Sequence, residues 1–573
     1  MSKYSKLLHF LIFILIKSFN CQIYCGISQI KYNVSFPNKK EFKTTDEQYR
    51  PIQIYIETTS LSDIYNPKKI NNTIVALNYT IKILQKLIKV KPLNYTISIN
   101  KDDLNKWGFV SYNQKLINGI DIDLIILIKY IEDTSDNFYM SSEPKYIDEY
   151  TKRPIVGIVY ISDLFISEIY TKRNFLYYTQ VLFLHQFTHI LGFLYGTFHN
   201  YPGGINNVIL TLNSDKRSNV KRSYIITPKV LKIAKKYYNC ENIVGMELED
   251  QDERTNSHWE SRLLLGEYMN SEHYSLELVI SEFTLALLED SGWYKVNYYT
   301  GGLMRFGKNK GCNFINNDCL LNSQFKNEFF NFNDMKYGCS SGRQSRGYTL
   351  DKQITDEDIT NYTRCAKKGY FETADYCFVY VSNINEENNY GMYVGNCNKG
   401  NGGYGGSVFY SNFTPKKNMY LPIELGEKYD NNSFCVLSSV SIKNTFEFYK
   451  FQNDIIHPMC YPMFCSQKSL TIQIYEQFVV CPRSGGKVQV NGTYEGFLFC
   501  PDYNLICTGT IICNDMFDCI EKESLIKNDT YFYDYEIKTN QIIDELINAK
   551  IETIVYELSE DGNVLKIVSN VII

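Results

Sequence analysis

Residues 184–193 constrain this chain more than any other stretch, because they place two histidines four residues apart in an apolar run that predicts a helix. His185 and His189 would lie on one face of that helix, where their imidazoles can bind a single metal ion. For such a pair taken alone, the alternative is two buried, hydrogen-bonded histidines. Gly192 favours the metal site, because it permits a sharp turn after which the chain can return with a third ligand.

Gln186 decides the chemistry of such a site. In zinc hydrolases with the HExxH pattern, the residue after the first histidine is a glutamate, which takes a proton from the zinc-bound water. Glutamine keeps the shape and one acceptor oxygen, but it cannot usefully accept that proton. General acid–base catalysis is typically worth about 10²–10⁴-fold in rate. The sequence therefore predicts a metal site with weak or absent hydrolysis.

A third ligand is needed, because catalytic zinc sites use three protein ligands and a water. The chain has seven histidines, of which His9 lies in a predicted signal peptide and His457 in the cysteine-rich part. Tyr195 stands where the commonest metzincin spacing would place the third histidine. Three candidates remain open from the residues alone: His199, His258 and His273.

Several blocks, in the right order along the chain, resemble the leishmanolysin family of metzincin peptidases. They are residues 226–230, 238–240, 245–249, 257–262, 267–269 and 285–294, with a looser match at 500–502. In that family a long insertion precedes the third zinc histidine, which lies in a His-Trp-Glu block and matches His258. The resemblance implies one zinc ion held by His185, His189 and His258. It also implies that Met269 is the Met-turn methionine, which packs beneath the metal.

The length of the chain and the changes in its hydrophobic pattern predict several domains, because 573 residues are more than one compact domain contains. Residues 1–21 have two lysines before a short apolar run and are predicted as a signal peptide, with an uncleaved anchor as the alternative. Residues 22–49 form an N-terminal segment. We expect an α+β, metzincin-like zinc-peptidase domain at 50–310. Helical periodicity then fades, which predicts a β-rich domain at 311–434 and a cysteine-rich region at 435–573.

Hydrophobic periodicity places the expected elements of the zinc-peptidase domain. Apolar runs predict three strands, at 52–56, 123–128 and 155–160. Helical spacing predicts helices at 75–90, 174–192, 230–238 and 281–291. Strands and helices in this order indicate a mixed arrangement of a sheet with an active-site helix.

Cysteine usage favours export. Eight of the 17 cysteines fall within residues 435–519. Their irregular spacing and the lack of interleaved histidines favour disulfides over zinc knuckles, with the connectivity left open. Several Asn-x-Ser/Thr sequons also fit a glycoprotein. We therefore expect a secreted or cell-surface protein.

The net charge of the chain limits the classes of molecule expected as binding partners. A net charge of −4 and the lack of a basic stripe argue against nucleic acid and anionic membranes. A peptide or protein substrate or ligand is expected, with possible membrane or cell-surface association. The sequence leaves the oligomeric state open.

Three functions follow from these patterns. The first is an exported zinc protein with impaired proteolysis, a pseudoenzyme that binds peptides or adheres to surfaces. The second is an active zinc endopeptidase that uses a non-standard base. The third is a metal-free adhesion or structural glycoprotein. A substitute base would have to come from nearby carboxylates, for which structural roles are favoured: Glu260, Glu267, Glu282 and Glu289.

Overall fold

The computed structural model of the chain divides into two compact units, Met1–Lys527 and Asn528–Ile573. The residues it describes are 48–64, 67–132, 140–162, 165, 175–213, 221–249, 257–271, 278–298, 304–317, 319, 328–329, 337–348, 374–375, 377, 379, 397, 425–430, 432–443, 456–466, 469–507, 552–558 and 564–572. The predicted signal peptide at 1–21, the candidate ligand His273 and the last cysteines lie outside these residues.

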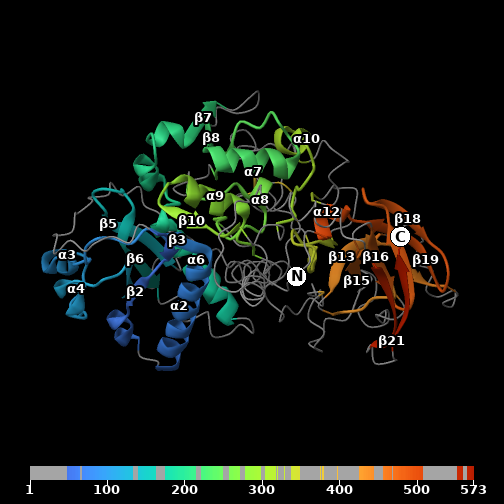
Figure 1. Cartoon of the computed structure of the whole chain (residues 1–573), viewed down its shortest axis with the longest axis horizontal. Helices are drawn as coiled ribbons and strands as arrows, with labels where there is room; N and C mark the ends of the chain where they lie inside the picture. The colour runs from blue at the N-terminus through green and yellow to red at the C-terminus, as the bar shows by residue number, and fades with distance from the viewer. Residues whose placement is uncertain are drawn as a thin grey trace, which may run out of the picture. The chain divides into compact units, whose positions relative to one another are not determined.

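A four-stranded sheet organises the N-terminal part of the larger unit (Figure 1). In order across the sheet, its strands are β2 (Ile54–Glu57), β4 (Leu124–Ile131), β6 (Pro154–Ser162) and β5 (Met140–Ile147). The first three strands are parallel, and β5 runs antiparallel to β6. β4 and β6 are nearly continuous runs of buried Ile, Leu and Val, as expected of strands covered on both faces.

Helices cover both faces of this sheet. On one face, α2 (Pro67–Leu87) packs beside α6 (Phe175–Leu191), and α6 contacts β5 and β6 (Figure 1). On the other face, an apolar cluster of β4 and β6 side chains packs against residues of α3 (Lys101–Lys106) and α4 (Lys115–Asn118). A Cβ added to Gly157 of β6 would lie 2.6 Å from Ile190 Cγ2, so this glycine lets α6 approach the sheet closely.

Two small sheets and several short helices complete the region around α6. One sheet contains β1 (Arg50–Pro51), β3 (Ile88–Val90) and β10 (Tyr294–Val296), and the other contains β7 (Ile209–Asn213), β8 (Lys221–Ile225) and β9 (Met246–Glu247). The helices are η1 (Thr59–Asp63), η3 (Tyr195–Asn200), η4 (Ile205–Asn207), α7 (Pro228–Tyr238), α8 (Ser261–Leu264), α9 (Glu282–Asp290) and α10 (Cys312–Asn316).

Capping residues explain where α7 begins and ends and where α9 begins. α7 begins with Pro228, which lacks an amide hydrogen, and ends at Asn239 in the left-handed conformation. At the start of α9 the side chain of Ser281 accepts a hydrogen bond from the amide of Thr284. α7 and α9 pack against each other.

A seven-stranded antiparallel sheet forms most of the described C-terminal part of this unit. Its strands are β13 (Ser433–Ser438), β14 (Ser441–Ile442), β15 (His457–Cys465), β16 (Leu470–Ile474), β17 (Gln477–Cys481), β18 (Gly486–Val490) and β19 (Tyr494–Cys500). Along β16, buried and half-buried residues alternate, which places one face on an apolar core. A hairpin of β11 (Tyr337–Cys339) and β12 (Arg346–Tyr348) and the helix α12 (Tyr503–Ile506) are also present.

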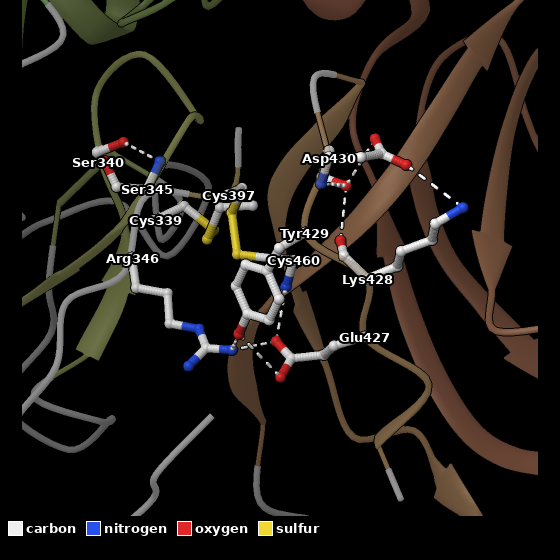
Figure 2. Close-up of a disulfide and its surroundings, with 12 residues drawn as sticks. Cys339, Ser340, Ser345, Arg346, Cys397, Glu427, Lys428, Tyr429, Asp430 and Cys460 are labelled. Atoms are coloured by element: carbon white, nitrogen blue, oxygen red, sulfur yellow. Dashed lines mark hydrogen bonds and ion pairs between the residues drawn. A yellow bond between two sulfur atoms is a disulfide. The ribbon is translucent and has the colours of Figure 1, made fainter. Parts of the chain in front are cut away.

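Six disulfides join the described cysteines, and five of them lie beyond residue 318. The pairs are Cys240–Cys312, Cys319–Cys377, Cys339–Cys435, Cys397–Cys460, Cys465–Cys507 and Cys481–Cys500. Figure 2 shows Cys397–Cys460 beside a polar network in which Arg346 reaches both Glu427 and the hydroxyl of Tyr429. The prediction of an α+β fold with a β-rich, disulfide-linked C-terminal region is confirmed.

In the smaller unit, the described residues form an antiparallel hairpin of β20 (Glu552–Leu558) and β21 (Val564–Ile572). In the larger unit, one described segment, Thr179–Asn200, is long and apolar enough to cross a membrane, but 89% of its most apolar window is buried in the protein. This segment includes most of α6.

Two sequence predictions differ from the structure. The helix expected at 75–90 begins earlier and ends at Leu87, because Ile88–Val90 pair instead with β1 and β10. Strand β5 was not expected, since Glu143, Pro144 and Lys145 interrupt its apolar pattern. Such residues are tolerated in β5 because it lies at the edge of its sheet.

Contacts cross the predicted boundary at residues 310–311. Arg262 of α8 donates hydrogen bonds to the carbonyls of Phe314 and Ile315. The disulfide Cys240–Cys312 joins the end of α7 to α10. Residues just beyond the boundary therefore help to hold the region at 50–310 together.

Candidate metal centre

Helix α6 carries the first two candidate ligands at its buried C-terminal end. His185 and His189 are fully buried and one helical turn apart, with ring centroids 4.6 Å apart. The helix ends at Gly192, whose φ of +139° is unfavourable for other residues. A Cβ at Gly192 would also lie 2.9 Å from the Trp293 ring. The turn expected after the second histidine is therefore present.

His258 reaches the same place from a distant segment of the chain. Its carbonyl accepts the amide hydrogen of Glu249 at 3.0 Å, and the next residue, Trp259, donates to the carbonyl of Met269 at 3.1 Å. Leu248 and Trp259 form an isolated β-bridge. The segment with His258 is thus held between residues 247–249 and the turn at 268–270.

The three imidazoles meet through their Nε2 atoms. His185 Nε2 lies 3.0 Å from His189 Nε2 and 3.3 Å from His258 Nε2. Two of the rings are oriented through their other nitrogen: Nδ1 of His185 donates to the carbonyl of Tyr268, and Nδ1 of His189 donates to the carbonyl of Phe193, both at 2.7 Å. A carbonyl only accepts, so both Nδ1 atoms carry the hydrogen and both Nε2 atoms carry a lone pair.

These distances fit a metal ion. Nitrogen ligands at about 2.0–2.1 Å from a tetrahedral zinc ion are about 3.3 Å apart. Two lone pairs that face each other without a hydrogen repel, and a cation between them removes that repulsion. Burial lowers the pKa of His185 to about 4 and also lowers that of His189, which favours the neutral form that binds metals. The residues therefore fit a zinc ion, because neutral imidazole nitrogens are among the ligands that zinc prefers.

Gln186 lies in α6 between the two histidines, and its side chain is fully buried. The hydroxyl of Ser142, in strand β5, donates to its backbone carbonyl at 3.0 Å. β5 is thereby held against α6 at the level of the site. The residue after the first ligand is thus a buried neutral amide, whose oxygen can accept a hydrogen bond from a water but cannot take its proton.

Met269 is fully buried at a turn that touches both ligand-bearing segments. Its carbonyl accepts from Trp259, beside His258, and the carbonyl of its neighbour Tyr268 accepts from His185. The hydroxyl of Tyr268 lies 2.9 Å from that of Thr188, in α6. This turn therefore fixes His185 and His258 relative to each other.

Three of the four carboxylates considered as substitute bases make defined contacts in the fold. Glu260 accepts from the amide of Arg262 and caps α8. Glu289 accepts from the hydroxyl of Tyr298 at 2.6 Å and pairs with Lys229. Glu267 is buried within a set of four donors, and Glu282 is a half-buried residue at the start of α9. Structural contacts account for Glu260, Glu267 and Glu289.

Glu267 should make stability depend on pH. Burial raises its pKa to about 7 from an ordinary 4.5, although Thr284, Ser281 and the amide of Met269 donate to it. A raised pKa stabilises the protonated form, so this contribution is complete below pH 4.5 and is lost as the pH rises towards 7. The contribution of Glu267 to the free energy of unfolding of metal-free protein should fall by about 3 kcal/mol across this window.

The measurement compares Glu267→Gln with wild type by chemical denaturation between pH 4 and 8, with a chelator present. Because glutamine does not titrate, the variant should lose this part of the slope. An identical pH profile in both proteins would contradict the assignment.

His199, the nearer alternative ligand, is exposed and does not join the cluster. Its ring packs 6.2 Å from the ring of Tyr195, which is 43% exposed. Among the described residues, the histidine cluster contains only His185, His189 and His258. The structure thus brings together the three residues that the family resemblance implied.

Sequence reasoning missed residues that hold the site from outside. The hydroxyl of Ser142 donates to the backbone carbonyl of Gln186, and the backbone carbonyl of Tyr268 accepts from His185. Contacts to main-chain carbonyls leave no pattern in the sequence. Arg222 and Asp375 belong to a buried ion cluster beside the third ligand segment. An arginine and an aspartate so far apart in the sequence gave no signal of their pairing.

A mixed sheet, a helix with two histidines and a third histidine on a returning segment define a metzincin-like metallopeptidase domain. A family model described as leishmanolysin matches residues 55–513. The chain therefore belongs to the leishmanolysin family.

Comparison with individual proteins supports this family assignment. The chain is 26% identical over 319 residues to a leishmanolysin-like peptidase of Drosophila pseudoobscura pseudoobscura, covering 49% of this chain and 44% of that protein. It is 40% identical over 97 residues to a leishmanolysin-like peptidase of Drosophila melanogaster, covering 17% and 14%. It is 26% identical over 366 residues to a ciliated left-right organizer metallopeptidase of Danio rerio, covering 62% and 50%. The chain thus spans half or less of the length of these relatives.

Proposed function

We propose that this chain is an exported, zinc-binding member of the leishmanolysin family whose proteolysis is impaired. The observation that carries the proposal is the convergence of three buried Nε2 atoms at 3.0 and 3.3 Å beside a glutamine. His185, His189 and His258 would hold one zinc ion. The glutamine leaves the site without its proton acceptor.

The zinc ion, the two backbone carbonyls behind its ligands and Gln186 would each have a separate chemical role. A bound zinc ion would lower the pKa of its water to about 7 and polarise a substrate carbonyl. The backbone carbonyls of Tyr268 and Phe193 keep the rings of His185 and His189 in the ligating tautomer. Gln186 can accept a hydrogen bond from a water but cannot store its proton or pass it to a leaving amine.

A peptide or protein is the expected partner. Strand β5 lies at the edge of the four-stranded sheet and contacts α6, next to the candidate metal centre. An edge strand offers backbone donors and acceptors that an extended peptide can pair with. This arrangement supports peptide binding without efficient cleavage.

Export is supported by the cysteines. Six disulfides among the described residues are typical of a protein from an oxidising compartment. A secreted or cell-surface location fits them and the predicted signal peptide. The expected protein is thus a stable extracellular zinc protein that retains a peptide-binding face.

Elemental analysis of the purified protein tests the metal part of the proposal. We expect about one zinc ion per chain and a thermal unfolding midpoint that falls when a chelator removes it. Protein lacking zinc, with a midpoint indifferent to both zinc and chelator, would instead support a metal-free adhesion or structural role.

A further inference from the structure

The segment that carries His258 adjoins a buried cluster of charged side chains from distant parts of the chain. Its members are Arg222, Glu247, Glu260, Arg262 and Asp375, all at most 6% exposed. Carboxylate oxygens of the three acids lie within 4.8 Å of one another. The two guanidinium groups lie among them, so we interpret the group as an ion-pair cluster.

Asp375 contacts both guanidinium groups. Its Oδ2 lies 3.2 Å from Arg222 Nη1 and 3.6 Å from Arg262 Nε. Arg222 Nη1 also pairs with Glu247. Asp375 therefore links an arginine of β8 to an arginine of α8.

The cluster is connected to the third ligand through the backbone. Glu247 directly precedes Leu248, which forms a β-bridge with Trp259, the residue after His258. The carbonyl of Glu247 accepts a hydrogen bond from the amide of Glu260 at 3.2 Å. The Glu260 side chain accepts the amide of Arg262 at 2.8 Å. Glu260 lies two positions after His258, so displacement of the cluster would displace the ligand.

Asp375 arrives from a part of the chain that a disulfide holds in place. Cys377, two residues later, is joined to Cys319. Arg262 is anchored separately, because its guanidinium donates to the carbonyls of Phe314 at 3.2 Å and Ile315 at 2.6 Å. The contact between Asp375 and Arg262 thus joins two independently fixed segments beside the site.

We infer that Asp375 is a positioning residue for the metal ligand His258, an inference that rests on the proposed zinc site. Three carboxylates and two guanidinium groups meet out of water. Removal of one charge from such a set is costly, because it leaves a buried opposite charge without full compensation. Without Asp375, Arg222 and Arg262 would shift, and the His258 segment would lose its fixed position.

The test uses Asp375→Asn in the full chain, with Glu328→Gln as the matched control. Glu328 is likewise a buried acid in the later part of the chain, paired with Arg343 at 2.9 Å, and it has no contact with the cluster among the contacts of the described residues. Zinc affinity is measured by competition with a chromophoric chelator. Hydrogen exchange of amides 257–264 is measured in protein stripped of metal.

We expect Asp375→Asn to weaken zinc binding by about tenfold or more, the range seen when groups behind metal ligands are removed. It should also speed exchange at 257–264, whereas Glu328→Gln should change neither. Equal behaviour of the two variants in exchange would overturn the inference. If the wild type binds no zinc, the proposed function fails, and exchange alone still decides whether Asp375 positions the segment.

A second variant covers the case in which Asp375→Asn does not fold. Arg222→Lys keeps the charge, but a single ammonium group has less reach to bridge Glu247 and Asp375. It should weaken zinc binding and speed exchange at 257–264 in the same direction. Wild-type affinity and wild-type exchange in Arg222→Lys would overturn the inference.

Discussion

Replacing Gln186 by glutamate should raise the rate at which the zinc-loaded protein cleaves an unfolded protein substrate by about 10²–10⁴-fold. The reason is that the substitution supplies a proton acceptor beside two ligands that the structure already positions. This gain corresponds to about 3–5 kcal/mol of the activation barrier. It should appear in kcat/KM measured with a fluorescent protein substrate.

Two controls separate chemistry from folding in this comparison. Gln186→Asp adds the same charge on a shorter side chain, so it should recover less activity than Gln186→Glu. Zinc content and thermal midpoint are measured for each variant, because position 186 is fully buried and a carboxylate there costs stability. Equal, robust rates in wild type and Gln186→Glu would show a working peptidase that uses another base.

Replacing His258 by alanine should abolish stable zinc binding. Partners behind a metal ligand are worth about 10–100-fold in affinity, so loss of a ligand itself should cost more than about 100-fold. We expect zinc content to fall from about one ion per chain to near zero after dialysis, as measured by elemental analysis.

His199→Ala is the matched control for that experiment. His199 is exposed and was the nearer candidate in the sequence, but its ring packs on Tyr195 away from the cluster. Its removal should leave zinc content and affinity unchanged. Loss of zinc in His199→Ala, with zinc retained in His258→Ala, would show that the ligand set is wrong.

The sequence predicted the helices and strands whose buried residues form a recognisable apolar run. Strands β4 and β6 and helix α6 were expected within a few residues, because continuous apolar runs mark fully covered elements. Strand β5 was missed because Pro144 and two charged residues break its pattern at the sheet edge. The order of the strands required pairings over long sequence separations, which periodicity does not encode.

The site was predictable to the extent that its residues belong to a family motif. His185, His189 and Gln186 follow from spacing on one helix. His258 was selected only through the resemblance, since three histidines remained open from the residues alone. Asp375 had no signal at all, because its role depends on a tertiary contact with Arg222 and Arg262.

The carbonyls that hold His185 and His189 have a consequence for how such a protein can diverge. Tyr268 and Phe193 contribute main-chain oxygens, which every amino acid possesses. Neighbouring side chains can therefore be replaced without changing the orientation of these two rings, as long as the backbone keeps its path. A single substitution can therefore remove the catalytic carboxylate from such a protein during evolution while the histidine rings keep the orientation that binds a cation.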